Sequence, residues 1–79
     1  MNMPTINVQQ TGLNIRRLMD VNGLVIKDVQ NVFGFNTPQA IYKWVHGDSL
    51  PTVDNLVVLS AIFGVGIDKI LVVERGAGQ

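Results

Sequence analysis

The sequence lacks several features that would point to particular classes of protein. It has no cysteine and a single histidine, His46, so neither a disulfide framework nor a zinc site with thiolate ligands can form. Absence of cysteine is consistent with a reducing compartment, and we expect a cytoplasmic protein that needs no metal and no cofactor. There is also no excess of charge of either sign, because six basic and six acidic side chains cancel.

Long hydrophobic runs are missing too. The longest strongly apolar stretch, residues 56–67, is interrupted by Ser60, Gly64 and Gly66 and is shorter than the ~20 residues of a membrane span. Residues 1–4 carry no positive charge and lead into no apolar run, so we expect no signal peptide. The hydrophobic fraction of 47% in 79 residues therefore indicates one domain with a packed core and no membrane contact.

No catalytic constellation stands out in the sequence. No histidine stands beside a serine or cysteine, no paired carboxylates lie at helical spacing in apolar surroundings, and no glycine loop is of the phosphate-binding kind. The aspartates Asp48, Asp54 and Asp68 stand at expected helix starts or turns, where capping explains them. We therefore expect neither an enzyme nor a protein with a small-molecule substrate.

What the sequence does contain is apolar residues at helical spacing, which predict five helices. The first begins after the N-cap Asn7, with Gln10 completing a capping box, and ends at Gly23. The other four are expected at about 25–33, 38–46, 53–63 and 67–72, with Thr52 as the N-cap of the helix at 53–63. The helical domain then covers 7–73, between a flexible arm at 1–6 and a disordered tail at 74–79. The β-branched residues at 71–73 leave a short extended segment open as an alternative.

The same periodicity predicts which side chains form the core. We expect the apolar stripes of the helices to pack against one another. They consist of Val8, Thr11, Ile15, Leu18, Met19 and Asn22; Leu24, Val29, Val32 and Phe33; Ile41, Trp44 and Val45; Leu56, Val57, Leu59, Ile62 and Phe63; and Ile67, Ile70 and Leu71.

The second and third helices predict a helix-turn-helix. A short helix is followed by a turn built on Gly34 and by a third helix with one apolar and one polar side. Thr37 before Pro38 is typical of an N-cap followed by proline at the first helical position. In such motifs the third helix enters the major groove of DNA, and side chains near its start reach the base edges.

Four side chains are expected to contact bases. Gln39 can pair bidentately with adenine, and Lys43, one turn later, can reach guanine or a phosphate. Tyr42 and Thr37 are expected to assist them. Phosphate contacts, which set the register of a protein on DNA, are expected from Arg16, Arg17, Lys27, His46 and Ser49.

Each of these side chains also has a purely structural explanation. Gln39 and Lys43 can be solvated surface residues, and Tyr42 can be half-buried against the fourth helix. His46 can serve only the negative end of the helix dipole. Both explanations remain open at this point.

The ordered set of motifs from about residue 12 to residue 71 resembles the helix-turn-helix domains of the Cro and phage-repressor type, also called the xenobiotic-response-element type. The similarity is carried by residues 15–18, by Phe33-Gly34-Phe35, by residues 40–44 and by Gly47 with the following Leu50-Pro51. It implies an all-α, compact five-helix lambda-repressor-like DNA-binding domain. It also implies sequence-specific binding of double-stranded DNA by a bacterial transcriptional regulator, usually a repressor, and leaves open a homodimer on a palindromic site.

The resemblance further implies roles for individual residues. Ile41 and Trp44 would hold the third helix on the core. The DNA-facing side chains would be Thr37, Gln39, Tyr42, Lys43 and His46.

Four departures from the family pattern support a second hypothesis. The turn before Ile41 is one residue longer than usual, and Val25-Ile26 replace a hydroxyl cap and a glutamine. Gln30 stands where a small residue is usual, and Asp48 where a basic residue is common. With zero net charge, these keep open a protein-interaction module on the same fold, antitoxin-like or regulator-docking, with weak or no DNA binding.

Overall fold

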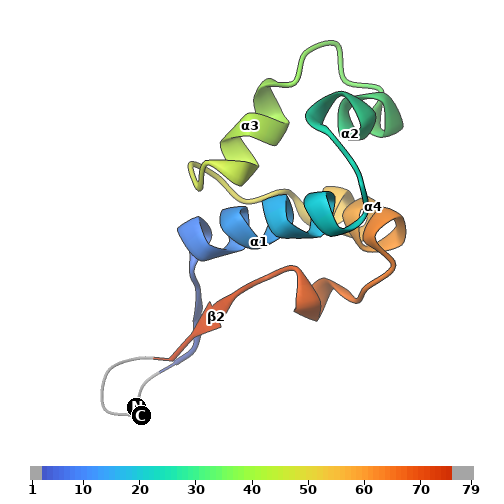
Figure 1. Cartoon of the computed structure of the whole chain (residues 1–79). Helices are drawn as coiled ribbons and strands as arrows, with labels where there is room; N and C mark the ends of the chain where they lie inside the picture. Colours follow the sequence, from blue (N-terminus) through green and yellow to red (C-terminus); the bar gives the residue numbers. More distant parts are fainter. Residues whose placement is uncertain (1–2, 76–79) are drawn as a thin grey trace.

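The computed structural model describes residues 3–75, which form four α-helices, one 3-10 turn and a two-stranded sheet (Figure 1). The elements are β1 (Thr5–Ile6), α1 (Val8–Val21), α2 (Ile26–Phe33), α3 (Gln39–Val45), α4 (Val53–Phe63), η1 (Ile67–Lys69) and β2 (Val73–Glu74).

The prediction of a fifth α-helix at 67–72 is wrong. Only Ile67–Lys69 are helical, and they form a 3-10 turn. The chain then becomes extended because two backbone hydrogen bonds tie it to the start of α1. The Val72 N–H donates to the Thr11 hydroxyl at 2.9 Å, and the Val72 carbonyl accepts from the Asn7 N–H at 2.8 Å.

Side chains and glycine set most of the helix ends as predicted. The Asn7 side chain accepts a hydrogen bond from the Gln10 backbone N–H at 2.8 Å, and the Thr52 hydroxyl accepts one from the Asn55 N–H at 3.4 Å. Both N-caps are therefore confirmed. α2 ends at Gly34, whose φ of 71° lies in the left-handed region that residues with a side chain rarely adopt.

Two details of the predicted helix starts are wrong. The reciprocal half of the capping box at α1 does not form, because the Asn7 backbone N–H is already bonded to Val72. Thr37 is not the N-cap of α3, because the first helical hydrogen bond runs from the Tyr42 N–H to the Pro38 carbonyl at 3.0 Å. Pro38 thus takes the cap position, and α3 begins at Gln39.

The core is assembled from one face of each helix and from Ile70. Its buried apolar residues are Ile15, Leu18, Met19, Val29, Ile41, Trp44, Val45, Leu56, Leu59, Phe63 and Ile70. Three residues of the predicted stripes are exposed instead: Val32 at 53%, Val57 at 56%, and Asn22 at the end of α1. In α4 the buried row is formed by Leu56, Leu59 and Phe63, and Val57 lies a further ~100° round the helix from Leu56.

The two ends of the described chain lie side by side as an antiparallel ribbon. Thr5 pairs with Glu74 and Ile6 pairs with Val73. The extended segment left open as an alternative at 71–73 is thus realised at Val73, whereas the sequence pattern does not predict its pairing with residues 5–6. Residues 1–2 and 76–79 of the expected arm and tail lie outside the described residues.

α1 holds both this C-terminal segment and α3. Its Asn14 amide donates to the carbonyls of Lys69 and Ile70 at 2.7 and 2.9 Å. On another side of α1, Gly12 is buried under the last turn of α3. A Cβ atom at Gly12 would lie 2.9 Å from the Val45 carbonyl oxygen and would clash with that of Trp44. The two helices can approach this closely only because residue 12 has no side chain.

Within residues 3–75, no helix combines the length and the apolar character needed to cross a lipid bilayer.

Gly12→Ala should therefore destabilise the domain by about 1–3 kcal/mol, the usual cost of overpacking, because backbone atoms of α3 must move. The matched control is Gly66→Ala. There the added methyl group meets only the end of the Asp68 side chain, which can rotate away. Urea denaturation of both variants measures the difference, and equal free energies of unfolding would contradict the account of the α1–α3 contact.

Candidate nucleic-acid interface

α3 lies at the surface with one side in the core and the other in solvent. Ile41, Trp44 and Val45 are 0%, 4% and 7% exposed, as the sequence predicts. The opposite side carries the exposed side chains of Gln39, Tyr42, Lys43 and His46, and the exposed Thr37 lies just before the helix. The structure thus brings together the residues expected to face DNA. Tyr42 is 42% exposed, so part of its ring is covered and part is open to solvent.

A cluster of three aromatic rings fixes α3 relative to α2. The rings of Phe33 and Phe35 stack with their centroids 4.9 Å apart, and the Trp44 ring meets them edge-on at 5.5 and 6.1 Å. Such edge-to-face contacts are favoured by the ring quadrupoles. The cluster joins the end of α2, the turn and the last turn of α3, so it sets the angle at which α3 presents its outer side.

The turn itself is closed by Gln30. Its side-chain amide donates to the Phe35 carbonyl at 3.1 Å, so the residue that departs from the family pattern has a local structural use. Sequence reasoning missed the positioning roles of Gln30 and Phe35. The sequence feature that could have indicated them is Phe33-Gly34-Phe35, which places one ring on each side of a glycine in the left-handed conformation.

The outer side of α3 combines an amide, a cation and two rings. Tyr42 and His46 lie one turn apart with ring centroids 5.7 Å apart and planes tilted by 31°. Gln39 and Lys43 are likewise one turn apart, so their polar ends project from one side of the helix. This set of donors can address base edges and phosphates at the same time.

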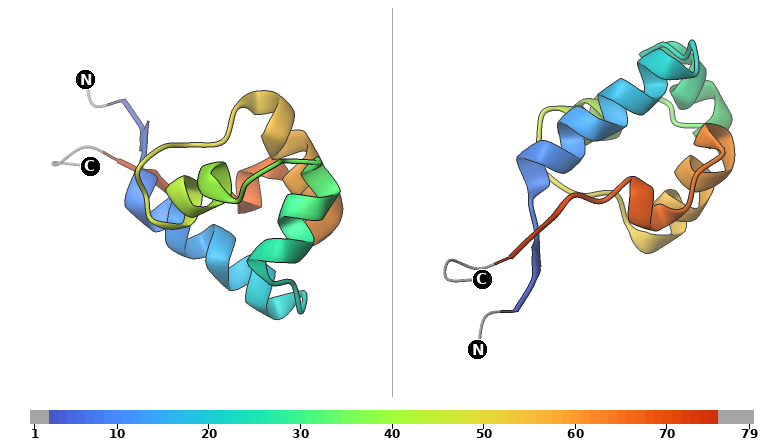
Figure 2. Two further views of the ribbon diagram at one scale, coloured as in Figure 1. Left: turned by 90° about the horizontal axis from the view of Figure 1, so that it is seen from above. Right: turned by 60° about the horizontal axis from the view of Figure 1, so that its bottom comes forward.

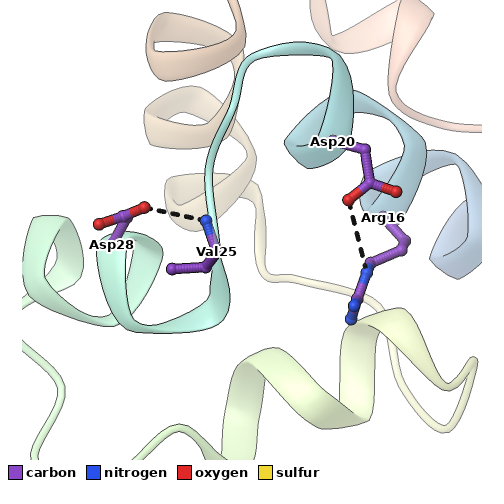
Figure 3. Close-up of polar contacts among 4 residues, drawn as sticks. All are labelled: Arg16, Asp20, Val25 and Asp28. Atoms are coloured by element: carbon purple, nitrogen blue, oxygen red, sulfur yellow. Dashed lines mark hydrogen bonds and ion pairs between the residues drawn. The ribbon is translucent and has the colours of Figure 1, made fainter.

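The expected phosphate contacts are spread more widely. Lys27 lies in the first turn of α2, and Ser49 follows α3 in the loop; both are exposed. Arg16 is exposed but lies 3.8 Å from the Asp20 carboxylate (Figure 3). Arg17 donates from two nitrogens to the Asn14 amide oxygen at 3.1 and 2.9 Å.

The structure does not bring Arg17 together with α3. Arg17 lines a shallow pocket of about 220 Å³ together with Val72, on the side of α1 that holds the C-terminal segment. Gly12 faces α3. Arg17 comes five residues after Gly12 and therefore lies ~140° away from it round α1, on a different side of the helix.

The start of α2 shows how the chain replaces its missing hydroxyl cap. Valine has no acceptor, but the Asp28 carboxylate accepts a hydrogen bond from the Val25 backbone N–H at 2.9 Å (Figure 3). The Val25 side chain is left 62% exposed, while Ile26 packs partly against the core. The described part of the chain holds no group of three or more metal-ligating side chains.

Comparison with known proteins supports the fold. No family model matches the sequence, and no curated protein matches it. Among solved structures, the crystal structure of the DNA-binding domain of BldD is similar, with a TM-score of 0.70 over 84% of this chain and 94% of that domain. The sequence identity is 24%, so this likeness concerns the fold: a compact, mostly helical domain with four helices.

Trp44→Ala should lower the free energy of unfolding by about 3–5 kcal/mol, because it removes the ring that joins α3 to the turn and leaves a cavity. The control is Tyr42→Ala on the exposed side of the same helix, with an expected loss of about 1 kcal/mol or less. Chemical denaturation measures both. A Trp44 variant as stable as the Tyr42 variant would rule out the aromatic cluster as the anchor of α3.

Proposed function

We propose that this chain binds double-stranded DNA sequence-specifically, with α3 in the major groove, and acts as a bacterial transcriptional regulator. The observation that supports this most is the division of α3 into two sides. Its apolar side is locked in the core, so its polar side is presented rigidly to a partner. A helix fits the major groove, and a rigid helix places its side chains without a further cost of ordering.

The residues on that polar side match the chemistry of base recognition. Gln39, the first residue of α3, offers an acceptor and a donor to adenine, and the Lys43 ammonium offers donors to guanine. Tyr42 and Thr37 assist, through a thymine methyl group, a sugar or a phosphate. His46 lies at the far end of this row and contacts the phosphate backbone.

Phosphate contacts would be few for a DNA-binding protein. Lys27 and Ser49 flank α3, whereas Arg16 is shared with Asp20, Arg17 lies apart, and Asp48 adds a negative charge just after the helix. With zero net charge, affinity for DNA of random sequence should be low. Recognition then depends on base contacts to a larger degree than in strongly basic domains.

The fold adds support of a general kind. The domain of BldD with which it shares its fold is described as DNA-binding. A DNA-binding role also agrees with the sequence-based expectation of neither an enzyme nor a cofactor.

A second candidate function is docking of a partner protein, which the surface of α2 favours. Val25 and Val32 are 62% and 53% exposed and lie two turns apart on one side of α2. Such an apolar surface suits a protein partner more than a phosphate backbone. Protein docking would be the supported function if duplex DNA does not bind at low salt and Val25→Asp abolishes binding of a protein partner.

Binding of the chain to duplex DNA should weaken as salt rises, with the modest slope that few phosphate contacts give, and Lys43→Ala should weaken binding to the preferred site by about 1–3 kcal/mol. Lys69→Ala is the matched control, since Lys69 is exposed in η1 and away from α3. Fluorescence anisotropy at several salt concentrations measures both. Unchanged affinity of the Lys43→Ala variant would remove Lys43 from the interface, and affinity independent of salt would contradict DNA binding.

Gln39→Ala should reduce discrimination between the preferred site and a site with one changed base pair by about 1–3 kcal/mol, while affinity for random DNA stays the same. Sites selected from a random duplex pool supply the two probes. The control is Gln10→Ala on α1, on the side that faces Val72. Equal loss on both probes would assign Gln39 to the backbone instead of a base.

A further inference from the structure

The β1–β2 ribbon is the one sheet in the described part of an otherwise helical domain. It stands out from the helices at the start of α1, away from α2 and α3, as Figures 1 and 2 show from three directions. All four of its residues are exposed, including the apolar Ile6 at 40% and Val73 at 52%. A two-stranded ribbon this short is at best marginally stable in water, and sheets usually gain stability from a third or fourth strand.

The pairing register decides which backbone groups the ribbon offers for a further strand. Antiparallel pairs alternate between hydrogen-bonded and non-hydrogen-bonded types. The Asn7 N–H donates to the Val72 carbonyl, so residues 7 and 72 point these groups toward each other, between the two segments. Ile6 and Val73, the next pair in register, therefore direct their N–H and C=O groups to the two outer edges.

The two outer edges are not equivalent. On the β1 edge, the next outward position after Ile6 is Pro4, which has no N–H to donate. Proline on an edge strand is a common way of blocking strand addition. On the β2 edge, the outward position within the strand is Val73, and continuing the alternation by two residues reaches Arg75; both carry an N–H and a C=O. The ribbon thus has one closed edge and one open edge.

We propose that a second copy of this chain pairs antiparallel along the open edge of β2, giving a four-stranded sheet in the order β1-β2-β2-β1. One open edge per chain makes the assembly stop at a dimer, because a two-fold axis uses up both open edges. The occupant is a second copy because the open edge is complementary to itself. The same outward N–H and C=O of Val73 bond to their counterparts.

Charge selects the register of this pairing. With Val73 opposite its own counterpart, Ile6 and Val73 of both copies form one apolar row across four strands, and Glu74 lies opposite Val72. If the two-fold axis of the dimer passed through Glu74 instead of Val73, Glu74 would lie opposite Glu74 of the second copy. Like charges directly opposite each other destabilise a sheet. The dimer does not depend on the proposed function, because the ribbon is separate from the outer side of α3.

The first test is the mass of the full chain in the absence of DNA, by sedimentation equilibrium over a concentration series. The expected result is a species of twice the 8.6 kDa of one chain that dissociates on dilution. Val73→Pro should raise the dissociation constant at least about tenfold, since it removes one outward N–H from each copy. Ile6→Pro removes the equivalent N–H from the closed edge and should leave the constant unchanged.

Circular dichroism checks that both proline variants stay helical. A chain that is monomeric throughout the series, or two variants that dissociate alike, would overturn the proposal. Because neither result involves DNA, failure here leaves the proposed function standing, and failure of DNA binding leaves the dimer standing.

A second measurement tests the register and does not depend on the proline variants. The chain has no cysteine, so Val73→Cys introduces a single thiol. Hydrogen-bonded antiparallel partners have Cα atoms about 5.5 Å apart, which a disulfide can span. Mild oxidation should therefore give a reducible covalent dimer of Val73→Cys but not of Ile6→Cys. Equal cross-linking of the two variants, or none of either, would overturn the register.

Discussion

The close contact between α1 and the end of α3 is the constraint on which the rest of the structure depends. Gly12 lets the carbonyl end of α3 rest almost on the α1 backbone. This contact buries Ile41, Trp44 and Val45 and directs the other side of the helix outward. The stacked rings of Phe33 and Phe35 then brace α3 from the direction of α2. The result is a rigid surface helix on a chain of zero net charge, and it concentrates the recognition chemistry in a few side chains.

Much of this arrangement could be predicted from the sequence, because it rests on local rules. Asn7 and Thr52 are N-caps, Gly34 ends α2 in the left-handed conformation, and the apolar spacing in α3 separates Trp44 from Lys43. The grouping of Gln39, Tyr42, Lys43 and His46 on one surface follows from helical periodicity alone. Their role in binding DNA remains a proposal, since a surface position does not identify what it binds.

The features that could not be predicted depend on contacts between residues distant in the sequence. Residues 67–72 have a helical pattern, but Val72 accepts a hydrogen bond from Asn7 and donates one to Thr11, and these bonds hold the chain extended just before β2. Val32 and Val57 fit the apolar periodicity of their helices, but other residues of α2 and α4 face the core in their place. The separation of Arg17 from α3 likewise depends on which side of α1 each neighbour occupies, and periodicity alone does not determine that.

The central claim is that the outer side of α3 is the surface that contacts DNA. The most direct test is to titrate isotope-labelled protein with a duplex that carries its selected site and to follow each backbone amide by NMR. The account predicts that the largest shifts fall at residues 39–46, with smaller ones near Lys27 and Ser49 and little change along α4. Shifts confined to α4 or the ribbon, or no shifts at saturating duplex, would contradict it.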